Sequence, residues 1–309
     1  MIKVPSFLVV GAPKAGTSSL YQYLQKHPDI YLPDQKELHY WSSAALAENT
    51  SGPGDQYSLL NVVTTWRYYC QHYKAAALEK QLGDVSPSYL YFYNRVIPEL
   101  KRQLPAVKII IMLRDPIERA YSNYLHQQRL TYEPLSFAEA LDCELKRSNA
   151  GYSDFWRYAA HSQYFLPCVA YVKAFGIANV HFITFEELKD NPSDVMSNVF
   201  SFLDVDENFR PDNLDKIYNS GGRFKESLLM RFLLRPSRFK SYFYNSLNEE
   251  WIRAYRSLKL KFTASRKLPI PEIPREVRAQ LTALFRDDVE ALSSKYDVNV
   301  KLWSGYDGK

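Results

Sequence analysis

The sequence predicts an α/β fold: one domain with a central parallel sheet flanked by helices and a P-loop-like nucleotide-binding core. Two stretches carry this prediction. Residues 6–24 contain a short apolar strand, a glycine loop and an amphipathic helix, in that order. The continuous apolar run Lys108–Leu113 is typical of a strand in a parallel sheet covered on both faces, and Pro116 then favours the start of a helix.

Later elements repeat this alternation of strands and helices. A second strand is expected at Asp84–Val85, where Pro87 stops it, and a fourth at Val180–Phe185, followed by a helix over about 192–203. Apolar residues at helical spacing after Pro274 predict an amphipathic C-terminal helix that joins the core. The order of elements favours a doubly wound sheet.

The composition is that of an ordinary globular protein. Of the 309 residues 46% are hydrophobic and 24% charged, which excludes a disordered or fibrous chain. Its three cysteines form no CxxC pair, which argues against a disulfide scaffold and a zinc ribbon. No stretch has the length of a secretion signal or a membrane span, so a cytoplasmic protein is expected. We predict a single domain over residues 1–309, with helical insertions at about 40–80 and 125–170.

The formal net charge of +5 is unevenly distributed. Residues 223–267 hold twelve Lys and Arg against three Glu, a local net charge of +9. We expect a basic helical segment that attracts an anionic ligand. A solvated basic face is the alternative. A nucleic-acid partner is not expected, because the chain lacks a recognition motif.

The loop between the first strand and the first helix combines several features that bind anions. Gly11 and Gly16 let the backbone turn tightly, the helix N-terminus offers free N–H groups, and Lys14 adds a charge. The pattern departs from the Walker sequence, because Thr17 stands where that sequence has its lysine. The loop therefore suits a phosphate but not an ordinary ATPase reaction. The candidate contacts are Pro13, Lys14, Ala15, Gly16, Thr17 and Ser18.

A second candidate phosphate site follows the strand Lys108–Leu113. Arg114 stands at the carboxyl end of this strand, where open α/β sheets bind ligands. Its guanidinium suits bidentate binding of a phosphate, assisted by the Ser122 hydroxyl on the next helix. Arg114 could instead pair with Asp115 or Glu118. Two phosphate sites at neighbouring strand ends indicate a ligand with two separate phosphates.

At this point the chain resembles the sulfotransferases that use 3′-phosphoadenosine 5′-phosphosulfate (PAPS), over residues 5 to 303. Their 5′-phosphosulfate loop is similar to residues 11–18, and their 3′-phosphate motif is similar to residues 114–122. Residues 36–41, 83–89, 184–192 and 221–223 resemble further motifs of the heparan-sulfate-type, carbohydrate branch and its bacterial relatives. Val85 is a departure, because heparan-type enzymes often carry a lysine there.

The resemblance implies in-line transfer of a sulfuryl group from PAPS to an acceptor hydroxyl, with adenosine 3′,5′-bisphosphate as product and no metal. Lys14 would stabilise the leaving phosphate, and Glu37 would be the general base, with His39 as the second candidate. Lys36 or His39 would meet the sulfuryl oxygens. The 3′-phosphate would be held by residues matching the family's motifs, namely Arg114, Ser122 and Arg223.

The acceptor is expected to be a glycan, a lipid-linked sugar or another small molecule. Eight tyrosines are expected partly to line its cleft: Tyr40, Tyr57, Tyr68, Tyr69, Tyr73, Tyr89, Tyr91 and Tyr93. Two alternatives stay open at this point. One is a P-loop kinase for a small molecule, and the other is a non-catalytic protein that binds a nucleotide.

Overall fold

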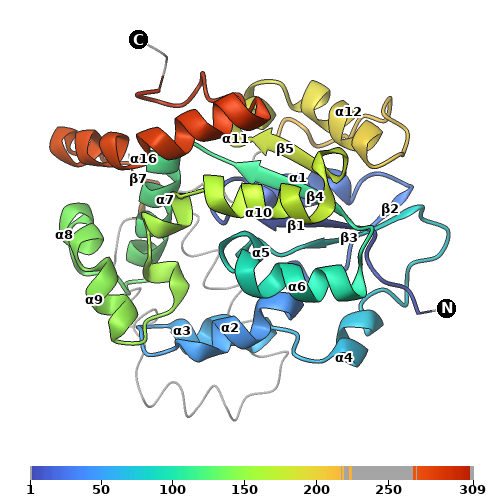
Figure 1. The fold of residues 1–309 in the computed structure, drawn as a ribbon, viewed down its shortest axis with the longest axis horizontal. Helices are drawn as coiled ribbons and strands as arrows, with labels where there is room; N and C mark the ends of the chain where they lie inside the picture. The colour runs from blue at the N-terminus through green and yellow to red at the C-terminus, as the bar shows by residue number, and fades with distance from the viewer. Residues whose placement is uncertain (1, 217, 219–222, 225–266, 269, 307–309) are drawn as a thin grey trace.

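A five-stranded parallel sheet lies at the centre of the computed structural model, which describes residues 2–216, 218, 223–224, 267–268 and 270–306 (Figure 1). The strand order is β2-β3-β1-β4-β5. The strands are β1 (Phe7–Gly11), β2 (Ile30–Tyr31), β3 (Gln81–Val85), β4 (Lys108–Leu113) and β5 (Val180–Thr184). This order confirms the α/β fold with a central parallel sheet, and it puts the two strands that precede the candidate phosphate sites, β1 and β4, side by side.

Helices cover both faces of this sheet. In Figure 1, α6 and α10 pack against each other in front of the sheet and α1 lies behind it. The longer helices are α1 (Thr17–Leu24), α6 (Tyr93–Gln103), α7 (Pro116–Arg129), α10 (Phe165–Phe175), α12 (Pro192–Phe202) and α16 (Arg275–Tyr296). The shorter ones are α2 (Ser43–Glu48), α3 (Asp55–Ser58), α4 (Trp66–Gln71), α5 (Ser88–Tyr91), α8 (Phe137–Asp142), α9 (Glu144–Asn149) and α11 (Phe185–Asp190).

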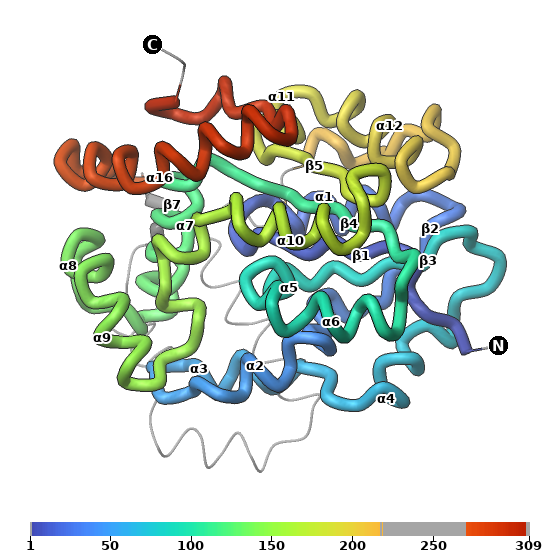
Figure 2. Tube along the Cα trace, viewed as in Figure 1, coloured from blue at the N-terminus to red at the C-terminus, as the bar shows by residue number. Residues whose placement is uncertain are grey.

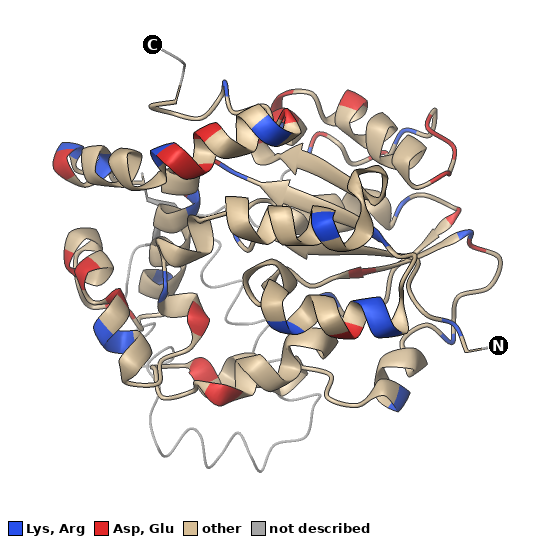
Figure 3. Ribbon diagram, in the orientation of Figure 1, with Lys and Arg blue, Asp and Glu red and all other residues tan. Residues whose placement is uncertain are grey.

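The central strands are apolar because neither of their faces meets water. The side chains of Phe7–Val10 and Ile109–Leu113 are fully buried. Figure 3 shows the same division, with most charged residues on the surrounding helices and loops. At Gly83 in β3 an added Cβ would lie 2.2 Å from the Phe7 ring, so the absence of a side chain there lets β3 approach β1.

The predicted elements are found close to their expected bounds, with three differences. The strand expected at Asp84–Val85 is β3, which begins three residues earlier, at Gln81. The strand β2 was not predicted, because it is only two residues long and pairs with β3 alone. The fourth strand ends at Thr184 rather than Phe185, because the Thr184 hydroxyl and the Glu187 carboxylate form a capping box that starts α11. The expected helix over 192–203 is α12, and the C-terminal helix is α16.

Most of the predicted basic segment, residues 223–267, lies outside the described residues. Its two ends are described: β6 (Arg223–Phe224) pairs antiparallel with β7 (Lys267–Leu268). The strand β6 lies against α7, the helix that carries Ser122.

The C-terminal part of the chain is tied to the start of α7. In Figure 2 the red tube of α16 runs beside α7, against which it packs. Asp115 makes the decisive link. Its Oδ1 accepts hydrogen bonds from the N–H groups of Ile117 and Glu118, at 2.9 and 3.1 Å, and caps the helix. Its Oδ2 accepts from the N–H and hydroxyl of Ser304, at 2.8 and 2.6 Å.

We expect Asp115→Ala to destabilise the protein strongly. The change removes the buried carboxylate that caps α7 and breaks two hydrogen bonds from the exposed Ser304, for a loss of about 2 kcal/mol in the free energy of unfolding. Urea unfolding followed by circular dichroism measures it. Asp190→Ala is the matched control, because Asp190 is exposed and its ion pair with Lys189 is long, at 3.9 Å. Equal stability of the two variants would contradict this role of Asp115.

Candidate active site

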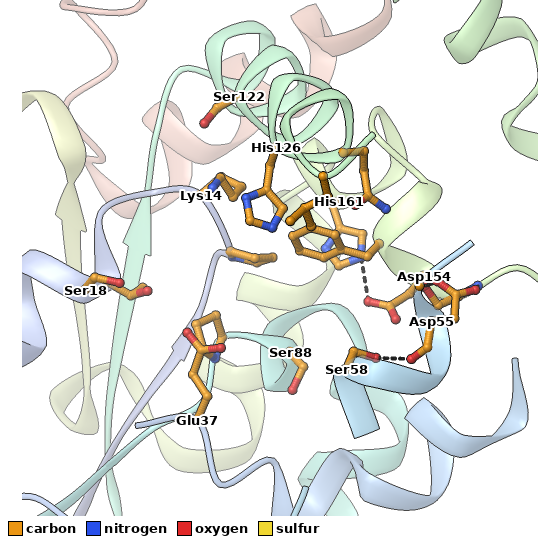
Figure 4. A pocket seen from close by; sticks show the side chains of 18 of the residues that line it. Lys14, Ser18, Glu37, Asp55, Ser58, Ser88, Ser122, His126, Asp154 and His161 are labelled. Atoms are coloured by element: carbon orange, nitrogen blue, oxygen red, sulfur yellow. Dashed lines mark hydrogen bonds and ion pairs between the residues drawn. The ribbon is translucent and has the colours of Figure 1, made fainter. Parts of the chain in front are cut away.

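A cavity of about 600 Å³ opens at the carboxyl ends of β1, β3 and β4 (Figure 4). Its walls come from the loops after these strands, from α7 and from two distant segments around residues 53–58 and 153–161. Nine of the twelve residues proposed from the sequence line it: Pro13, Lys14, Gly16, Thr17, Ser18, Glu37, His39, Arg114 and Ser122. The topology therefore brings together side chains that lie more than one hundred residues apart in the chain.

The other three predicted residues differ in position. Ala15 is fully buried and its N–H donates to the Ala12 carbonyl at 3.2 Å, so its side chain serves the packing of the loop. Lys36 lies beside the cavity and contacts Glu37 and Thr17. Arg223 belongs to β6, and its side chain lies outside the described residues.

The loop after β1 presents a set of donors without acceptors. The N–H groups of Gly16, Thr17 and Ser18 have no hydrogen-bond acceptor within the described part of the chain. Gly16 has a φ of 94°, a conformation that residues with a side chain rarely adopt. An added Cβ would also lie 2.6 Å from the Phe185 ring, so both the backbone and the lack of space require glycine here. Three N–H donors at a helix N-terminus form a binding site for an anion.

Lys14 is the cation of this loop. It has a φ of 69°, in the left-handed region, and its ammonium has no acceptor among the residues that the structure describes. Burial, together with the positive charges of Arg129 and Arg114, lowers the pKa of Lys14 to about 7. An anion bound beside Lys14 would relieve this repulsion and raise its pKa.

Arg114 extends the positive charge toward α7. Its Nη1 donates to the Lys14 carbonyl at 3.3 Å, and its guanidinium lies 4.7 Å from the centre of the Phe185 ring. Its buried Nε has no partner in the described part of the chain. Ser122, two turns into α7, lines the same part of the cavity. Neither Asp115 nor Glu118 pairs with Arg114, because Asp115 caps α7 and Glu118 pairs with Arg278 at 2.8 Å.

Arg119, in the same motif, has a structural position. Its side chain is fully buried, and it donates to Ser162 Oγ at 2.6 Å and to the carbonyls of Pro13, at 3.4 Å, and Tyr158. It thereby connects α7, the phosphate loop and the segment around residue 160.

Glu37 and His39 project from a backbone held in unfavourable conformations. Their φ angles are 67° and 54°, which non-glycine residues rarely adopt. The Glu37 N–H donates to the Val85 carbonyl at 3.1 Å, which anchors the loop on β3. Residues held in such conformations gather at functional sites, because the surrounding contacts must impose them.

The Glu37 carboxylate is kept ionised by its neighbours. Partial burial would raise the pKa of Glu37, but the Lys36 ammonium and His39 outweigh it and hold this pKa well below its usual range. Lys36 Nζ donates to Glu37 Oε1, and His39 Nε2 lies 3.6 Å from Glu37 Oε2. The side chain keeps 43% of its surface exposed, so the carboxylate is accessible from the cavity.

The residues behind this loop are polar and buried. The Ser86 hydroxyl donates to Asp84 Oδ1 at 2.7 Å and accepts from the His39 N–H at 3.0 Å. Ser86 is fully buried, which favours an anchoring role over contact with an acceptor. Burial raises the pKa of Asp84, whereas hydrogen bonds from Ser86, Tyr89 and Tyr69 oppose that rise.

The expectation for the tyrosines is wrong for most of them. Of the eight, only Tyr57 lines the large cavity. Tyr69, Tyr73 and Tyr89 are fully buried, and the hydroxyls of Tyr69 and Tyr89 donate to Asp84 Oδ2 at 3.0 and 2.9 Å. Two of these tyrosines thus hydrogen-bond a buried carboxylate, and all three belong to the core and not to an acceptor cleft.

Three functional candidates were missed by the sequence analysis. His126 and Arg129 follow Ser122 at helical spacing on α7, and this spacing was the available signal. Arg129 Nη2 donates to His126 Nδ1 at 3.1 Å. Burial, Lys14 and Arg129 hold the pKa of His126 well below its usual range, so the ring is neutral. The third candidate is Asp154, at the far end of the cavity.

Asp154 contacts His161, whose ring is fixed by stacking on Tyr91. Its Oδ2 lies 2.9 Å from His161 Nε2, and the His161 ring stacks on Tyr91 at 3.9 Å between centres. The Asp154 side chain is only 9% exposed. In Figure 4, Lys14 lies between Ser18 and Ser122 on one side and Asp154, Asp55 and Ser58 on the other.

The far wall depends on Asp55. Its carboxylate accepts from the Gly52 and Ser153 N–H groups, the Ser153 hydroxyl and the Trp156 indole, each at 2.8 Å. These bonds join two segments about one hundred residues apart. Within the described residues no group of three or more His, Cys, Asp or Glu is placed to hold a metal ion.

Comparison with known proteins identifies the family to which a protein with this site belongs. The model of the sulfotransferase family matches residues 5–209, about two thirds of the chain and most of the cavity-lining residues. The chain belongs to the sulfotransferase family. The resemblance seen in the sequence is thereby confirmed.

A solved sulfotransferase from Alicyclobacillus acidocaldarius is similar over almost the whole of this sulfotransferase. The two are 29% identical with a TM-score of 0.76, over 98% of this chain and 99% of that one. The membrane-associated sulfotransferase kil1 of Dictyostelium discoideum is 32% identical over 124 residues, which are 40% of this chain and 23% of the relative. Mouse carbohydrate sulfotransferase 15 is 29% identical over 152 residues, 40% of this chain and 27% of the relative.

The chain spans about a quarter of the length of these curated relatives. Among the described residues no helix is both long and apolar enough to cross a membrane.

We expect Lys14→Met to stabilise the protein without ligand, and more so in acid. The folded-state pKa of Lys14, about 7, lies below the unfolded value of 10.5, so the cost of the buried charge is fully present below about pH 7 and disappears as the pH rises toward 10.5. The variant should therefore melt at least roughly 3 °C higher at about pH 6, with the gain shrinking by about pH 10. Differential scanning calorimetry at both pH values measures it. A gain that is absent, or that grows with pH, would contradict the burial of this charge.

Proposed function

We propose that the protein transfers a sulfuryl group from PAPS to a hydroxyl of an acceptor. The observation that carries this proposal is the division of the cavity: at two neighbouring strand ends lie donors that have no acceptor among the described residues, and an ionised carboxylate lies beside them. Membership of the sulfotransferase family supports the same reaction.

The residues at the strand ends fit a nucleotide with separate 5′ and 3′ phosphates. PAPS, when bound, supplies the sulfuryl group and a phosphate as its leaving group. The N–H groups of Gly16, Thr17 and Ser18 and the Lys14 ammonium would bind that phosphate and stabilise the charge it gains. Arg114, through its open Nε, and Ser122 would bind the 3′-phosphate. Arg223 is proposed as a further contact from the resemblance alone.

Glu37 would take the proton of the acceptor hydroxyl. Its carboxylate is ionised and lies between the phosphate loop and the far end of the cavity (Figure 4). Lys36 contacts both Glu37 and Thr17, so we propose that its ammonium would stabilise the charge on the transferred group during in-line displacement.

The far end of the cavity supports a carbohydrate acceptor. The Asp154 carboxylate, held at 2.9 Å from His161 Nε2, offers acceptor atoms for sugar hydroxyls, and Tyr57 and Tyr132 line the same cavity. Carboxylates and aromatic faces together suit the polar edges and apolar faces of a sugar. Names of similar proteins point the same way, since they include a carbohydrate sulfotransferase and, in Drosophila melanogaster, a heparan sulfate N-deacetylase/N-sulfotransferase.

The kinase alternative is disfavoured by the loop itself. Thr17 occupies the position of the Walker lysine, and the loop's cation, Lys14, lies three residues earlier in the chain. The alternative of a non-catalytic binding protein does not explain why Glu37 and His39 are held in unfavourable backbone conformations, which gather at functional sites. Both alternatives give distinct results in the experiments below.

We expect adenosine 3′,5′-bisphosphate to bind without Mg²⁺ and more tightly than adenosine 5′-phosphate. Arg114→Ala should weaken binding of the bisphosphate by about 10-fold to 100-fold, because a charge-assisted pair is lost, and leave the monophosphate nearly unaffected. Isothermal titration calorimetry in EDTA measures both affinities.

Arg278→Ala is the control for Arg114, because it removes a guanidinium whose partner is Glu118 on the surface of α7. A requirement for Mg²⁺, or equal affinity for the two nucleotides in the wild type, would contradict the proposed donor and favour the kinase.

We expect Glu37→Gln to abolish transfer while nucleotide binding is kept. Loss of a general base should lower kcat by about 10³-fold, since such groups contribute about 10²-fold to 10⁴-fold. A ³⁵S-PAPS transfer screen over glycans, lipids and phenols identifies the acceptor and measures the loss. Glu48→Gln is the matched control, because Glu48 is exposed and pairs with Arg95 on the outside of the protein.

Two results of this screen would contradict the proposal. Wild-type protein that binds adenosine 3′,5′-bisphosphate but transfers nothing would favour the non-catalytic alternative. A Glu37→Gln variant with unchanged kcat would remove Glu37 from the reaction.

A further inference from the structure

Both ring nitrogens of His39 face a polar group. Nε2 lies 3.6 Å from Glu37 Oε2, and Nδ1 lies 2.6 Å from Ser88 Oγ. The ring is mostly buried, with 18% of the side chain exposed. Three nearby groups carry charge: Glu37 and Lys36 on the same loop, and Asp84 on β3. The protonation of each nitrogen is therefore decided by its immediate neighbour.

Glu37 determines the state of Nε2. An ionised carboxylate offers only lone pairs, and an imidazole nitrogen without a proton also presents a lone pair. A bare Nε2 facing Glu37 would place two acceptors against each other in a partly buried site. A proton on Nε2 turns the same contact into an attraction. The arrangement therefore requires an N–H at Nε2.

Two serines accommodate the other nitrogen. Ser88 Oγ lies 2.7 Å from Ser42 Oγ, and Ser42 Oγ lies 3.2 Å from the His39 carbonyl. When His39 is neutral, Ser42 donates to Ser88 and Ser88 donates to Nδ1. When His39 is charged, Nδ1 donates to Ser88, Ser88 to Ser42, and Ser42 to the carbonyl. Each hydroxyl donates once in both arrangements, so neither state leaves a donor unpaired.

We propose that Ser88, supported by Ser42, is a positioning residue that holds the His39 ring with its Nε2–H turned toward Glu37, so that Glu37 alone accepts the proton of the acceptor. The catalytic part rests on the proposed function, whereas the state of His39 is a property of the free protein. In the reaction the hydroxyl proton passes to the Glu37 carboxylate while the new O–S bond forms. The S–O bond to the 5′-phosphate breaks, and its electron pair stays on the phosphate.

The fold holds this arrangement from two sides. Ser88 opens α5 and Ser42 closes the short 3₁₀ helix Tyr40–Ser42, and both are buried. The His39 backbone, at a φ of 54°, is fixed separately through Ser86. The ring is thus set by Ser88 and the backbone by Ser86.

The test is the protonation of His39 in solution. In nucleotide-free protein labelled with ¹⁵N-histidine, long-range ¹H–¹⁵N spectra at about neutral pH report the proton on each ring nitrogen. His39→Gln assigns the signals. The wild type should show a protonated Nε2, and Ser88→Ala should shift the Nδ1 signal and admit a measurable fraction of the other tautomer. A wild type with a bare Nε2, or a Ser88→Ala spectrum equal to that of the wild type, would overturn the proposal.

Kinetics with the acceptor found by the transfer screen give the second readout. Ser88→Ala should lower kcat by about tenfold with unchanged affinity for adenosine 3′,5′-bisphosphate, and Ser88→Thr should restore it, because the hydroxyl is regained. Ser43→Ala is the matched control, since the Ser43 hydroxyl donates to the Tyr40 carbonyl at 2.7 Å and does not contact His39.

Three further outcomes distinguish a folding defect, a purely structural role of Ser88 and a failure of the proposed function. If Ser88→Ala does not fold, Ser42→Ala should shift the same Nδ1 signal by a smaller amount, and no shift there would overturn the proposal. A loss of kcat without any spectral change would also overturn it, because the role would then be purely structural. A wild type with the expected spectrum but no transfer would refute the proposed function and leave the assignment of His39 standing.

Discussion

Unbalanced positive charge at one edge of the sheet is the constraint on which the rest of this structure depends. Lys14 and Arg114 meet where β1 and β4 end, and both line a partly buried cavity together with Arg129 of α7, whose charge also acts on Lys14. The chain supplies few internal counter-charges there, since Glu37 is paired with Lys36. Such a site is costly for the free protein and favourable for a ligand with several negative charges.

Two buried hydrogen-bond networks fix the positions of the residues at this edge of the sheet. Arg119, buried without an ion pair among the described residues, fastens the phosphate loop to α7 through Pro13. Asp84 is kept deep in the sheet by tyrosine hydroxyls and transmits its position through Ser86 to the backbone of His39. Both networks place polar groups in the interior, where each must be fully hydrogen-bonded, and they connect the catalytic candidates to rigid strands and helices.

The parts of the site that could be predicted are those with local signals. The phosphate loop is contiguous, and Arg114 directly follows an apolar strand, so parallel topology alone brings them together. The far end of the cavity could not be predicted, because Asp55 joins it to residues about one hundred positions later through hydrogen bonds that leave no pattern. The tyrosines were misjudged for a related reason: nothing in the sequence shows that a buried carboxylate at Asp84 needs their hydroxyls.

The link between Asp115 and Ser304 has a consequence for how the molecule responds to its ligand. Arg114 and Asp115 are adjacent, so the guanidinium that we propose for the 3′-phosphate and the carboxylate that holds the segment after α16 belong to neighbouring residues. If Arg114 binds the phosphate as proposed, we expect docking of that segment and occupation of the phosphate site to be coupled, and such coupling is reciprocal. Ligand binding should slow hydrogen exchange at the Ser304 amide, far along the chain from any residue that contacts the nucleotide.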